Sequence, residues 1–347
     1  MEIRVIEKNV IYENPTPQLK SKHSYFPFVQ QLEDGSLLSS HVIGEAFESI
    51  DQNTRLSKST DMGKTWKLLQ PVYTKANQHI PANDYMKLTN IGGGELLLFG
   101  YEFFRENPDL PLGNPDTGGI LPDRLICLRS HDYGNNWDRP FEISCRWNNQ
   151  VEASAPITVL NNGDWVTPIT GFPSWDGKIP QYNCGRLLRS NNHGKTWNDN
   201  TVIIEFPGNS ISIYEQRMCQ LNKSGAIVAI SWNEDLITGK RLPNHYSISY
   251  DHGYTFNGPH STEIMGQASS VTSIGKDRLL ALHSLRRDTG RPGIYGYIVN
   301  LEKGGWNIEY ETILWEPLMP VTRNPKMAEI FAFLKFGQPS CWMMAPL

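Results

Sequence analysis

Long apolar runs are absent from this sequence: no stretch of its 347 residues is long and apolar enough to span a membrane. The N-terminal residues 1–4 also lack the charged and apolar regions of a signal peptide. Both observations predict a cytoplasmic protein without a membrane partner, although a secreted chain whose signal had been trimmed would look the same. The sequence leaves the oligomeric state open.

Cysteine is scarce, and basic residues form no run. The cysteines are scattered without the spacing of metal ligands, so we predict reduced thiols, no metal site and no cofactor. The formal net charge is −4 and no Lys- or Arg-rich segment occurs, which argues against a nucleic-acid partner. The five cysteines are Cys127, Cys145, Cys184, Cys219 and Cys341.

What the sequence does contain is a repeated pattern, Ser-x-Asp-x-Gly-x-Thr-Trp. Copies of it, some of them degenerate, begin at Ser59, Ser130, Ser190 and Ser249, so the steps between them are 71, 60 and 59 residues. The third copy has Asn192 in place of the aspartate. A near-constant step is typical of a repeat fold.

Each copy has the chemistry of a tight turn between two strands. The aspartate can accept hydrogen bonds from its own turn, the glycine can adopt a positive φ, and the aromatic residue can cover apolar surface. We therefore interpret the four copies as folding elements and not as catalytic ones.

An apolar strand, a glycine-containing turn and a second apolar strand precede each copy. A fifth such unit precedes a degenerate copy at 300–306, and a sixth begins near Phe336. Together they predict one domain over residues 1–347, an all-β, six-bladed β-propeller of four-stranded antiparallel blades. We expect segment 3–12 to complete the last blade, which is short at the C-terminus.

The pattern and its spacing resemble those of the sialidase (neuraminidase) superfamily, whose repeats are called Asp boxes or BNR repeats. The resemblance covers nearly the whole chain and implies the propeller fold. The same fold carries sialidases, other exo-glycosidases, polysaccharide lyases and sugar-binding proteins, so the reaction has to be argued from the site.

The resemblance also implies a site, which this sequence matches only in part. Sialidases hold the substrate carboxylate with three arginines, and use an Asp near the first blade as acid/base and a Tyr activated by a Glu as nucleophile. Here Phe26 occupies the place of the first arginine, and Trp232 lies in the strand where another arginine is expected. Gln338 lies near the expected tyrosine position, whereas Glu215 matches the activating glutamate.

Carboxylates at the blade ends opposite the repeated turns are expected to line a central pocket. Glu215 is the first candidate, because it begins an inner strand and is followed two residues later by Arg217, which would share its face. A structural ion pair between the two is the alternative interpretation. Asp51 is the candidate acid by position, with Glu45 and Glu48 as competitors.

Arginines and aromatic residues would bind the sugar. The segment 286–293 holds three arginines suited to a carboxylate or a sulfate, and a solvated surface loop is its alternative interpretation. The predicted substrate-binding residues are Arg217, Arg286, Arg287, Arg291, Asp84, Trp175 and Gln338.

These residues predict an exo-acting glycoside hydrolase with an acidic or hydroxyl-rich sugar as its substrate. Glu215 would act as base or as activator of the nucleophile, and an acid from the Asp51 loop would protonate the leaving group. Arg217 and Arg287 would hold the sugar. A non-catalytic sugar-binding propeller and a polysaccharide lyase are the alternatives.

Overall fold

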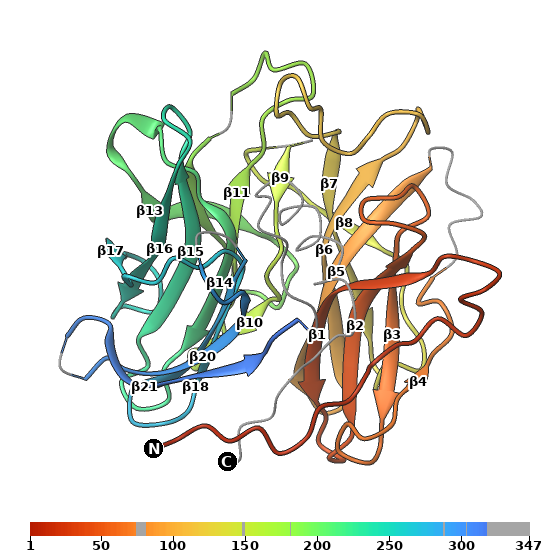
Figure 1. Cartoon of the computed structure of the whole chain (residues 1–347), viewed down its shortest axis with the longest axis horizontal. Coiled ribbons are helices and arrows are strands. Elements are labelled where there is room, and N and C mark those ends of the chain that lie inside the picture. Colours follow the sequence, from red (N-terminus) through yellow and green to blue (C-terminus); the bar gives the residue numbers. More distant parts are fainter. Residues whose placement is uncertain (74–80, 148–149, 181, 287–288, 303, 318–347) are drawn as a thin grey trace.

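The computed structural model describes residues 1–73, 81–147, 150–180, 182–286, 289–302 and 304–317. These residues form five antiparallel sheets that lie side by side as the blades of a propeller (Figure 1). The described helical structure is one short 3-10 helix, η1 (Pro207–Asn209). No helix in these ranges is long and apolar enough to cross a membrane. The predicted all-β propeller of four-stranded blades is therefore confirmed.

Strands follow one another within each blade in chain order, except that β9 pairs with β11 beside β10. Blade 1 contains β1 (His23–Gln31), β2 (Leu37–Gly44), β3 (Asn53–Ser59) and β4 (Lys67–Leu68). Blade 2 contains β5 (Ala82–Gly92), β6 (Glu95–Phe104), β7 (Asp123–Ser130) and β8 (Phe141–Ile143). Blade 3 contains β9 (Val151–Glu152), β10 (Thr158–Val159), β11 (Trp165–Gly171), β12 (Cys184–Ser190) and β13 (Asn198–Glu205).

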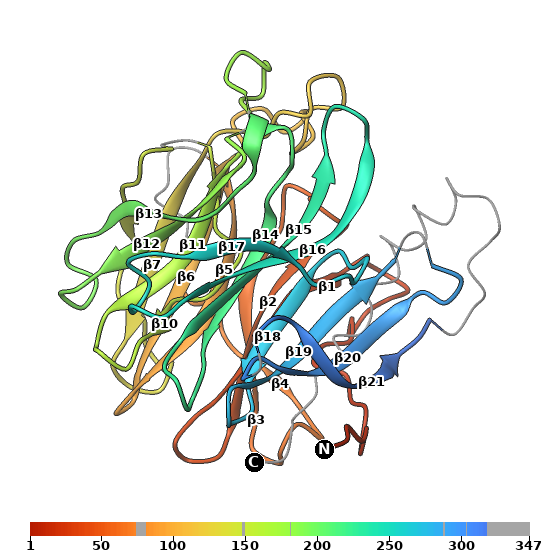
Figure 2. The ribbon, with the colours of Figure 1, turned by 90° about the vertical axis from the view of Figure 1, so that its left-hand side faces the viewer.

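The remaining two blades have four strands each. Blade 4 contains β14 (Tyr214–Gln220), β15 (Ile227–Asp235), β16 (Lys240–Ser249) and β17 (Asn257–Ser261). Blade 5 contains β18 (Ser269–Ser273), β19 (Arg278–Leu285), β20 (Gly293–Asn300) and β21 (Asn307–Trp315). Figure 2 shows blade 5 from the side, next to β14 to β17.

The prediction of six blades is not confirmed, because the described residues form five sheets. The unit expected from Phe336 onward lies outside the described residues. Segment 3–12, expected to complete that blade, forms no strand. A strand needs a neighbour for its backbone N–H and C=O groups, and segment 3–12 pairs with no described strand.

The N-terminal segment instead packs against two blades. A Cβ atom on Gly296 of β20 would lie 3.2 Å from Ile3 Cδ1, which places the start of the segment against blade 5. Farther along, Ile11 is buried, and the ring of Tyr12 lies 6.0 Å from that of His41 on β2. The segment thus connects blade 5 with blade 1 through side-chain packing.

The four repeated turns fold as the sequence predicts. In the first turn, Ser59 Oγ accepts a hydrogen bond from Gly63 N at 2.8 Å, and Asp61 Oδ1 accepts one from Thr65 N at 2.9 Å. Trp66 Nε1 donates to Gly63 O at 3.1 Å. The residue before each glycine also has a positive φ, which the sequence did not indicate. These residues are Met62, Tyr133, His193 and His252.

Large apolar side chains fill the interfaces between neighbouring blades. Leu38 and Leu56 of blade 1 pack in one buried cluster with Met86 and Leu98 of blade 2. Their burial provides the main favourable free energy of association between the blades. The described cysteines are free thiols, and Cys341 lies outside the described residues. The described cysteines are Cys127, Cys145, Cys184 and Cys219.

Candidate functional site

Five ionisable side chains from blades 2, 3 and 4 lie close together: the charges of Glu215 and Arg217 both contribute to the pKa shifts of Lys87, Tyr101 and Glu152. They come from β5, β9 and β14, which are the leading strands of three consecutive blades, and from β6, the second strand of blade 2. Perturbed groups of this kind often mark functional sites. We call these five residues the central cluster: Lys87, Tyr101, Glu152, Glu215 and Arg217.

Two β-bulges shape the strands that border the central cluster. The register of β14 shifts between Tyr214 and Arg217, and Glu215 in that bulge has a φ of 44°. The register of β1 shifts between Tyr25 and Phe28, where Phe26 has a φ of 52°. Positive φ is unfavourable for residues with a Cβ atom, and bulges of this kind redirect side chains beside active sites.

Neutral groups hold the two carboxylates of the cluster. Trp232 Nε1 donates a hydrogen bond to Glu215 Oε2 at 2.7 Å. Ser154 N donates one to Glu152 Oε1 at 2.9 Å. Only 4% of the Glu152 surface is exposed, and this burial raises the pKa of its carboxyl to about 6, although Ser154 and Arg217 oppose the shift.

Neutral oxygens likewise hold the two cations. Lys87 is 7% exposed, and its Nζ donates to Phe26 O at 2.5 Å. Burial lowers the pKa of Lys87 to about 7, and the charge of Arg217 adds to this effect. Arg217 Nη1 donates to Ser154 Oγ at 2.7 Å, to Gln216 O at 2.8 Å and to Glu215 O at 3.3 Å.

The charges of the central cluster are therefore not neutralised by ion pairs. Among the residues that the structure describes, no ion pair joins Lys87 or Arg217 to Glu152, to Glu215 or to another carboxylate. The charges of Glu215 and Arg217 both contribute to the pKa shifts of Lys87 and Glu152. Glu215 and Arg217 do not, however, form the structural ion pair that was the alternative interpretation. Buried charges are usually paired. Because these are not, both the cations and the carboxylates of the cluster remain available to a ligand.

A group of packed aromatic side chains lies beside the cluster, and two of them, Tyr85 and Phe103, are buried. The ring of Tyr101 stacks on Tyr85 at 5.7 Å and meets the ring of Phe103 edge-on at 4.9 Å. Phe26 contacts Tyr85 edge-on at 5.8 Å, and the predicted sugar-binding residue Trp175 packs against the same group. Aromatic rings beside polar groups suit a sugar, whose C–H faces pack on rings while its hydroxyls form hydrogen bonds.

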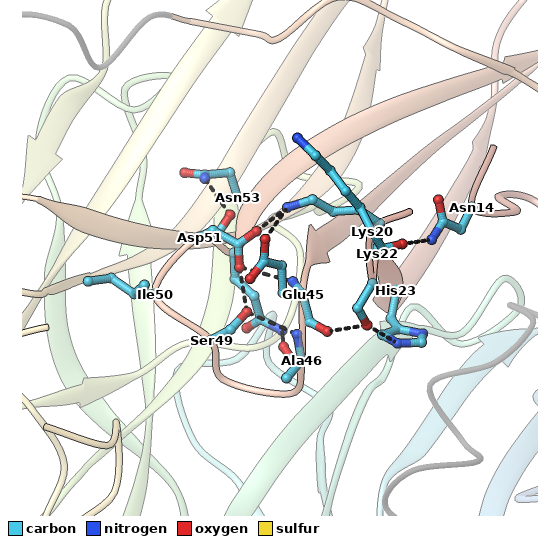
Figure 3. A network of polar contacts seen from close by, with 12 residues as sticks. Asn14, Lys20, Lys22, His23, Glu45, Ala46, Ser49, Ile50, Asp51 and Asn53 are labelled. Carbon is cyan, nitrogen blue, oxygen red and sulfur yellow. Dashed lines mark hydrogen bonds and ion pairs between the residues drawn. The ribbon is translucent and has the colours of Figure 1, made fainter. Parts of the chain in front are cut away.

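Asp51, the predicted acid, is held by contacts within its own loop and by Lys22, which precedes β1 (Figure 3). Its carboxylate accepts hydrogen bonds from Ser49 Oγ at 2.6 Å and from Glu45 N at 2.9 Å, and it pairs with Lys22. Burial favours a higher pKa for Asp51, but these contacts outweigh it and hold the pKa below its ordinary value. A carboxylate that stays ionised is a poor proton donor.

Glu48 of the same loop has the opposite electrostatics. Burial raises the pKa of Glu48, and the charge of Arg105 opposes the shift. Burial and then the charge of Glu48 raise the pKa of Tyr85, whose ring stacks on Tyr101 of the central cluster. Glu48 is thus the carboxyl of this loop whose charge acts on Tyr85 in the aromatic group.

Asp84 lies between blades 1 and 2 and is only 1% exposed. Its Oδ1 accepts a hydrogen bond from Thr54 N at 2.7 Å, and its Oδ2 accepts one from Tyr73 OH at 3.1 Å. These bonds connect the two blades, so the Asp84 carboxylate has a structural role. The binding role that the sequence suggested for it stays a prediction.

The predicted arginine loop is only partly described. Arg291 is exposed and forms an ion pair with Glu316 at 2.5 Å. The backbone N of Arg286 donates to Gln267 Oε1 at 2.9 Å. Arg287 and Gln338 lie outside the described residues. None of the contacts described for this loop links it to the central cluster.

Sequence reasoning did not assign a role to Lys87 or Tyr101. Lys87 is the one charged residue in the strand segment 85–88, which otherwise reads as a buried apolar strand. Such an isolated charge is the signal that could have found it. Tyr101 follows Gly100, where a Cβ atom would lie 2.0 Å from Tyr85 O, so the glycine allows the close approach of β5 and β6.

No family model matches the chain, and no curated protein matches its sequence. Solved structures do match. A protein of unknown function from Dyadobacter fermentans is 19% identical, with a TM-score of 0.70 over 90% of this chain and 86% of that one. The chain has the fold of sialidase-like propellers. A Hadza microbial sialidase is 17% identical, with a TM-score of 0.61 over 85% of this chain and 59% of that one.

A third match is the intramolecular trans-sialidase from Ruminococcus gnavus, 13% identical, with a TM-score of 0.60 over 86% of this chain and 84% of that one. The chain spans 59% of the length of the Hadza sialidase, which is therefore a longer chain. At these identities the likeness shows the fold, and the reaction has to come from the chemistry of the central cluster.

Proposed function

We propose that this chain is a carbohydrate-active enzyme, an exo-acting glycoside hydrolase that holds its sugar at the central cluster. One observation carries the proposal: Glu152 and Glu215 lie near each other in different environments, and neither forms an ion pair with a described residue. Most glycosidases use two carboxyl groups, one as acid and one as base or nucleophile. A carboxyl group whose pKa is raised by burial, as that of Glu152 is, suits the acid role.

The roles follow from the surroundings of each carboxyl group. Glu152, with its pKa raised to about 6, keeps a proton that it can give to the glycosidic oxygen as the bond to the anomeric carbon breaks. Glu215, oriented by Trp232, would attack the anomeric carbon or take a proton from the nucleophile. Lys87 and Arg217 would bind polar groups of the sugar, and the ring of Tyr101 would lie beside it.

The acid predicted from the Asp51 loop remains an alternative to Glu152. Within that loop, the raised pKa of Glu48 suits a proton donor better than the lowered pKa of Asp51. The fold supports a sugar ligand in general, because two of the similar structures are a sialidase and a trans-sialidase.

The test compares four variants on a panel of aryl glycosides and oligosaccharides. We expect Glu215→Gln and Glu152→Gln to lower kcat by about 100-fold or more, since general acid–base help contributes about 10²–10⁴-fold. Asp51→Asn serves as the matched control from the loop, and Glu48→Gln tests the alternative acid. Thermal unfolding of each variant shows whether the fold is retained.

A change of leaving group identifies the acid. A dinitrophenyl glycoside needs no proton on its leaving oxygen, so Glu152→Gln should regain most of its activity on that substrate, while Glu215→Gln should not. Recovery by Glu48→Gln instead would transfer the role to the loop. Sugar binding without turnover by the unaltered protein would favour the non-catalytic propeller, and an unsaturated product that absorbs in the ultraviolet would favour the lyase.

A further inference from the structure

Two polar side chains from neighbouring blades meet above a glycine in the interface between blades 4 and 5. Asn244 lies on β16 and His283 on β19, and both are fully buried. Gly266 lies between β17 and β18, in the segment that joins the two blades. A Cβ atom on Gly266 would lie 2.8 Å from Asn244 Oδ1 and 2.9 Å from His283 Nδ1, so these two atoms are at most 5.7 Å apart, the sum of the two distances.

Neither of these two atoms has a hydrogen-bond partner among the residues that the structure describes. Asn244 Nδ2 donates to Gln267 O at 3.1 Å, which fixes the amide and leaves its Oδ1 on the side of Gly266. The second ring nitrogen of His283 is unpartnered within the same residues. Buried polar atoms nearly always have a partner, because a buried atom that loses its bond to water and gains no other costs free energy.

Another buried histidine shows what such a ring normally requires. His41, on the second strand of blade 1, hydrogen-bonds to Ser24 Oγ at 3.0 Å and to Ser57 Oγ at 2.9 Å. In blade 5, Ser269 lies directly opposite His283 in the strand register, but its Oγ also lacks a partner in the described part of the chain. Side chains opposite each other in antiparallel strands have Cβ atoms about 4.5–5.5 Å apart, so the Ser269 hydroxyl can reach the same space.

The donors and acceptors of these groups match a water molecule. Burial lowers the pKa of His283 to about 3, so its ring is neutral near pH 7 and has one donor and one acceptor nitrogen. Asn244 Oδ1 only accepts, whereas water both donates and accepts. One water that bonds to two atoms at about 2.8 Å each bridges a separation of up to about 5.6 Å, which agrees with the limit set by Gly266.

An ion matches the same groups less well. Burial is the one cause of the lowered pKa of His283, and no charged side chain contributes to it. An amide oxygen, a neutral imidazole and a hydroxyl supply no charge to balance an ion, and a buried ion without an opposite charge is unfavourable. Buried waters typically make about three hydrogen bonds to groups that lack other partners.

We propose that Asn244, His283 and Ser269 bind one internal water molecule, which joins blade 4 to blade 5 by hydrogen bonds. Gly266 is needed beside it, because a methyl group at this position would occupy the space between Asn244 Oδ1 and His283 Nδ1. A water can leave when His283 is replaced, whereas the serine hydroxyls bonded to His41 cannot. The inference does not depend on the proposed function.

The water lies next to the contact that holds the start of the arginine loop. Gln267 follows Gly266, and its main-chain oxygen accepts the bond from Asn244 Nδ2. The side chain of the same glutamine accepts a hydrogen bond from Arg286 N through Oε1 at 2.9 Å. The water and Gln267 thus connect blade 4 with the first residue of that loop.

A high-resolution crystal structure of the whole chain tests the bridge directly. We expect one spherical density peak at hydrogen-bond distance from both Asn244 Oδ1 and a ring nitrogen of His283. A direct hydrogen bond between the two side chains, or no peak between them, would overturn the inference. Density for a larger or heavier group would overturn it as well, because it would assign the position to an ion.

Oxygen-17 relaxation dispersion counts long-lived internal waters in solution, and two variants assign one of them to this position. Gly266→Ala fills the space, so we expect it to lose one water relative to the unaltered protein. Gly296→Ala is the matched control in blade 5, because its Cβ atom would meet the apolar Leu314 Cδ1 at 2.6 Å, and its count should not change.

The same count in Gly266→Ala and in the unaltered protein would contradict the water bridge. Equal losses in both variants would contradict it too, since the loss would then follow from disturbed packing. If Gly266→Ala does not fold, the crystal structure of the unaltered chain still decides between the outcomes.

Discussion

Trp232 Nε1 donates a hydrogen bond to Glu215 Oε2 at 2.7 Å, across the paired strands β14 and β15. The ring of Trp232 also lies 4.4 Å from that of Tyr214, which fixes the orientation of the indole. The bond therefore acts on a carboxylate that the bulge at Glu215 has already directed into the central cluster. Trp232 is the positioning residue for Glu215.

Replacement of Trp232 by Phe should lower kcat by about tenfold with little change in KM. A hydrogen bond to a charged group contributes about 1.5–3 kcal/mol, and about 1.4 kcal/mol corresponds to a tenfold change in rate. Steady-state kinetics measure the effect. Trp137→Phe is the matched control, because Trp137 Nε1 donates to Gly134 O in a repeated turn. Equal losses in both variants would mean that Trp232 contributes only to folding.

Replacement of Lys87 by Met should stabilise the protein. The pKa of Lys87 is lowered from 10.5 to about 7 in the folded state, so the folded state disfavours the charged form. The resulting loss of stability is complete below pH 7, decreases as the pH rises, and disappears above pH 10.5. Lys87→Met should therefore raise the free energy of unfolding by about 2–5 kcal/mol at pH 6 and by little near pH 10.5.

Thermal or urea unfolding at both pH values checks this prediction. Arg217→Met is a useful companion, since arginine does not titrate in this range and its effect should not change between pH 6 and pH 10. A stabilisation by Lys87→Met that is the same at both pH values would contradict the lowered pKa. Stability gained at the cost of ligand binding is the usual sign of a functional residue.

Two buried histidines should respond differently to replacement by leucine. Burial lowers the pKa of both His41 and His283 to about 3. His41 hydrogen-bonds to Ser24 Oγ at 3.0 Å and to Ser57 Oγ at 2.9 Å, whereas neither ring nitrogen of His283 has a hydrogen-bond partner among the described residues. His41→Leu leaves two hydroxyls unpaired, so it should cost about 1–3 kcal/mol more at pH 7 than His283→Leu.

The same histidines set part of the acid stability. A histidine that stays neutral when folded keeps its full contribution above pH 6.5, and this contribution is lost as the pH falls from 6.5 toward 3. His283→Leu should therefore lose less stability than the unaltered protein between pH 6.5 and pH 4. Chemical denaturation at these two pH values measures the difference, and parallel losses would contradict the neutral state of His283.

The repeated turns were predictable because local contacts decide them. Ser59, Asp61 and Gly63 bond to one another within five residues, so the pattern carries its own structure. Closure of the propeller depends on pairing between distant segments. Segment 3–12 has a strand-like sequence, but it packs by side chains because it pairs with no described strand.

The position of Glu215 at the start of an inner strand could be predicted from the sequence. Its bulge and its bond to Trp232 could not, because both depend on the register of β14 against β15. Lys87 was missed because alternation within a strand gives the face of a side chain and not its neighbours. The distance of Asp51 from the first repeated turn suggested an acid, but its contacts with Lys22 and Ser49 arise from loop geometry.

The aspartate of a repeated turn should be replaceable by asparagine but not by alanine. Asp251 Oδ1 accepts from Thr255 N at 2.9 Å, and its Oδ2 accepts from Thr255 Oγ1 at 2.6 Å. Asn192 in the third turn forms the equivalent pair, with Oδ1 accepting from Thr196 N at 2.9 Å and Nδ2 donating to Thr196 Oγ1 at 2.8 Å. The threonine hydroxyl donates in the Asp251 turn and accepts in the Asn192 turn, and the hydrogen-bond geometry is the same in both.

Asp251→Ala removes both bonds, together with those from Ser249 Oγ and Tyr254 N, and should lower Tm by about 1–3 °C, whereas Asp251→Asn should lower it by less than half as much. Asn192→Asp is the reverse test and should leave Tm nearly unchanged, since the threonine hydroxyl can rotate to donate again. Differential scanning calorimetry of the three variants decides the point. If Asp251→Asn is as destabilising as Asp251→Ala, the negative charge holds the turn, and the third turn must then be the weakest of the four.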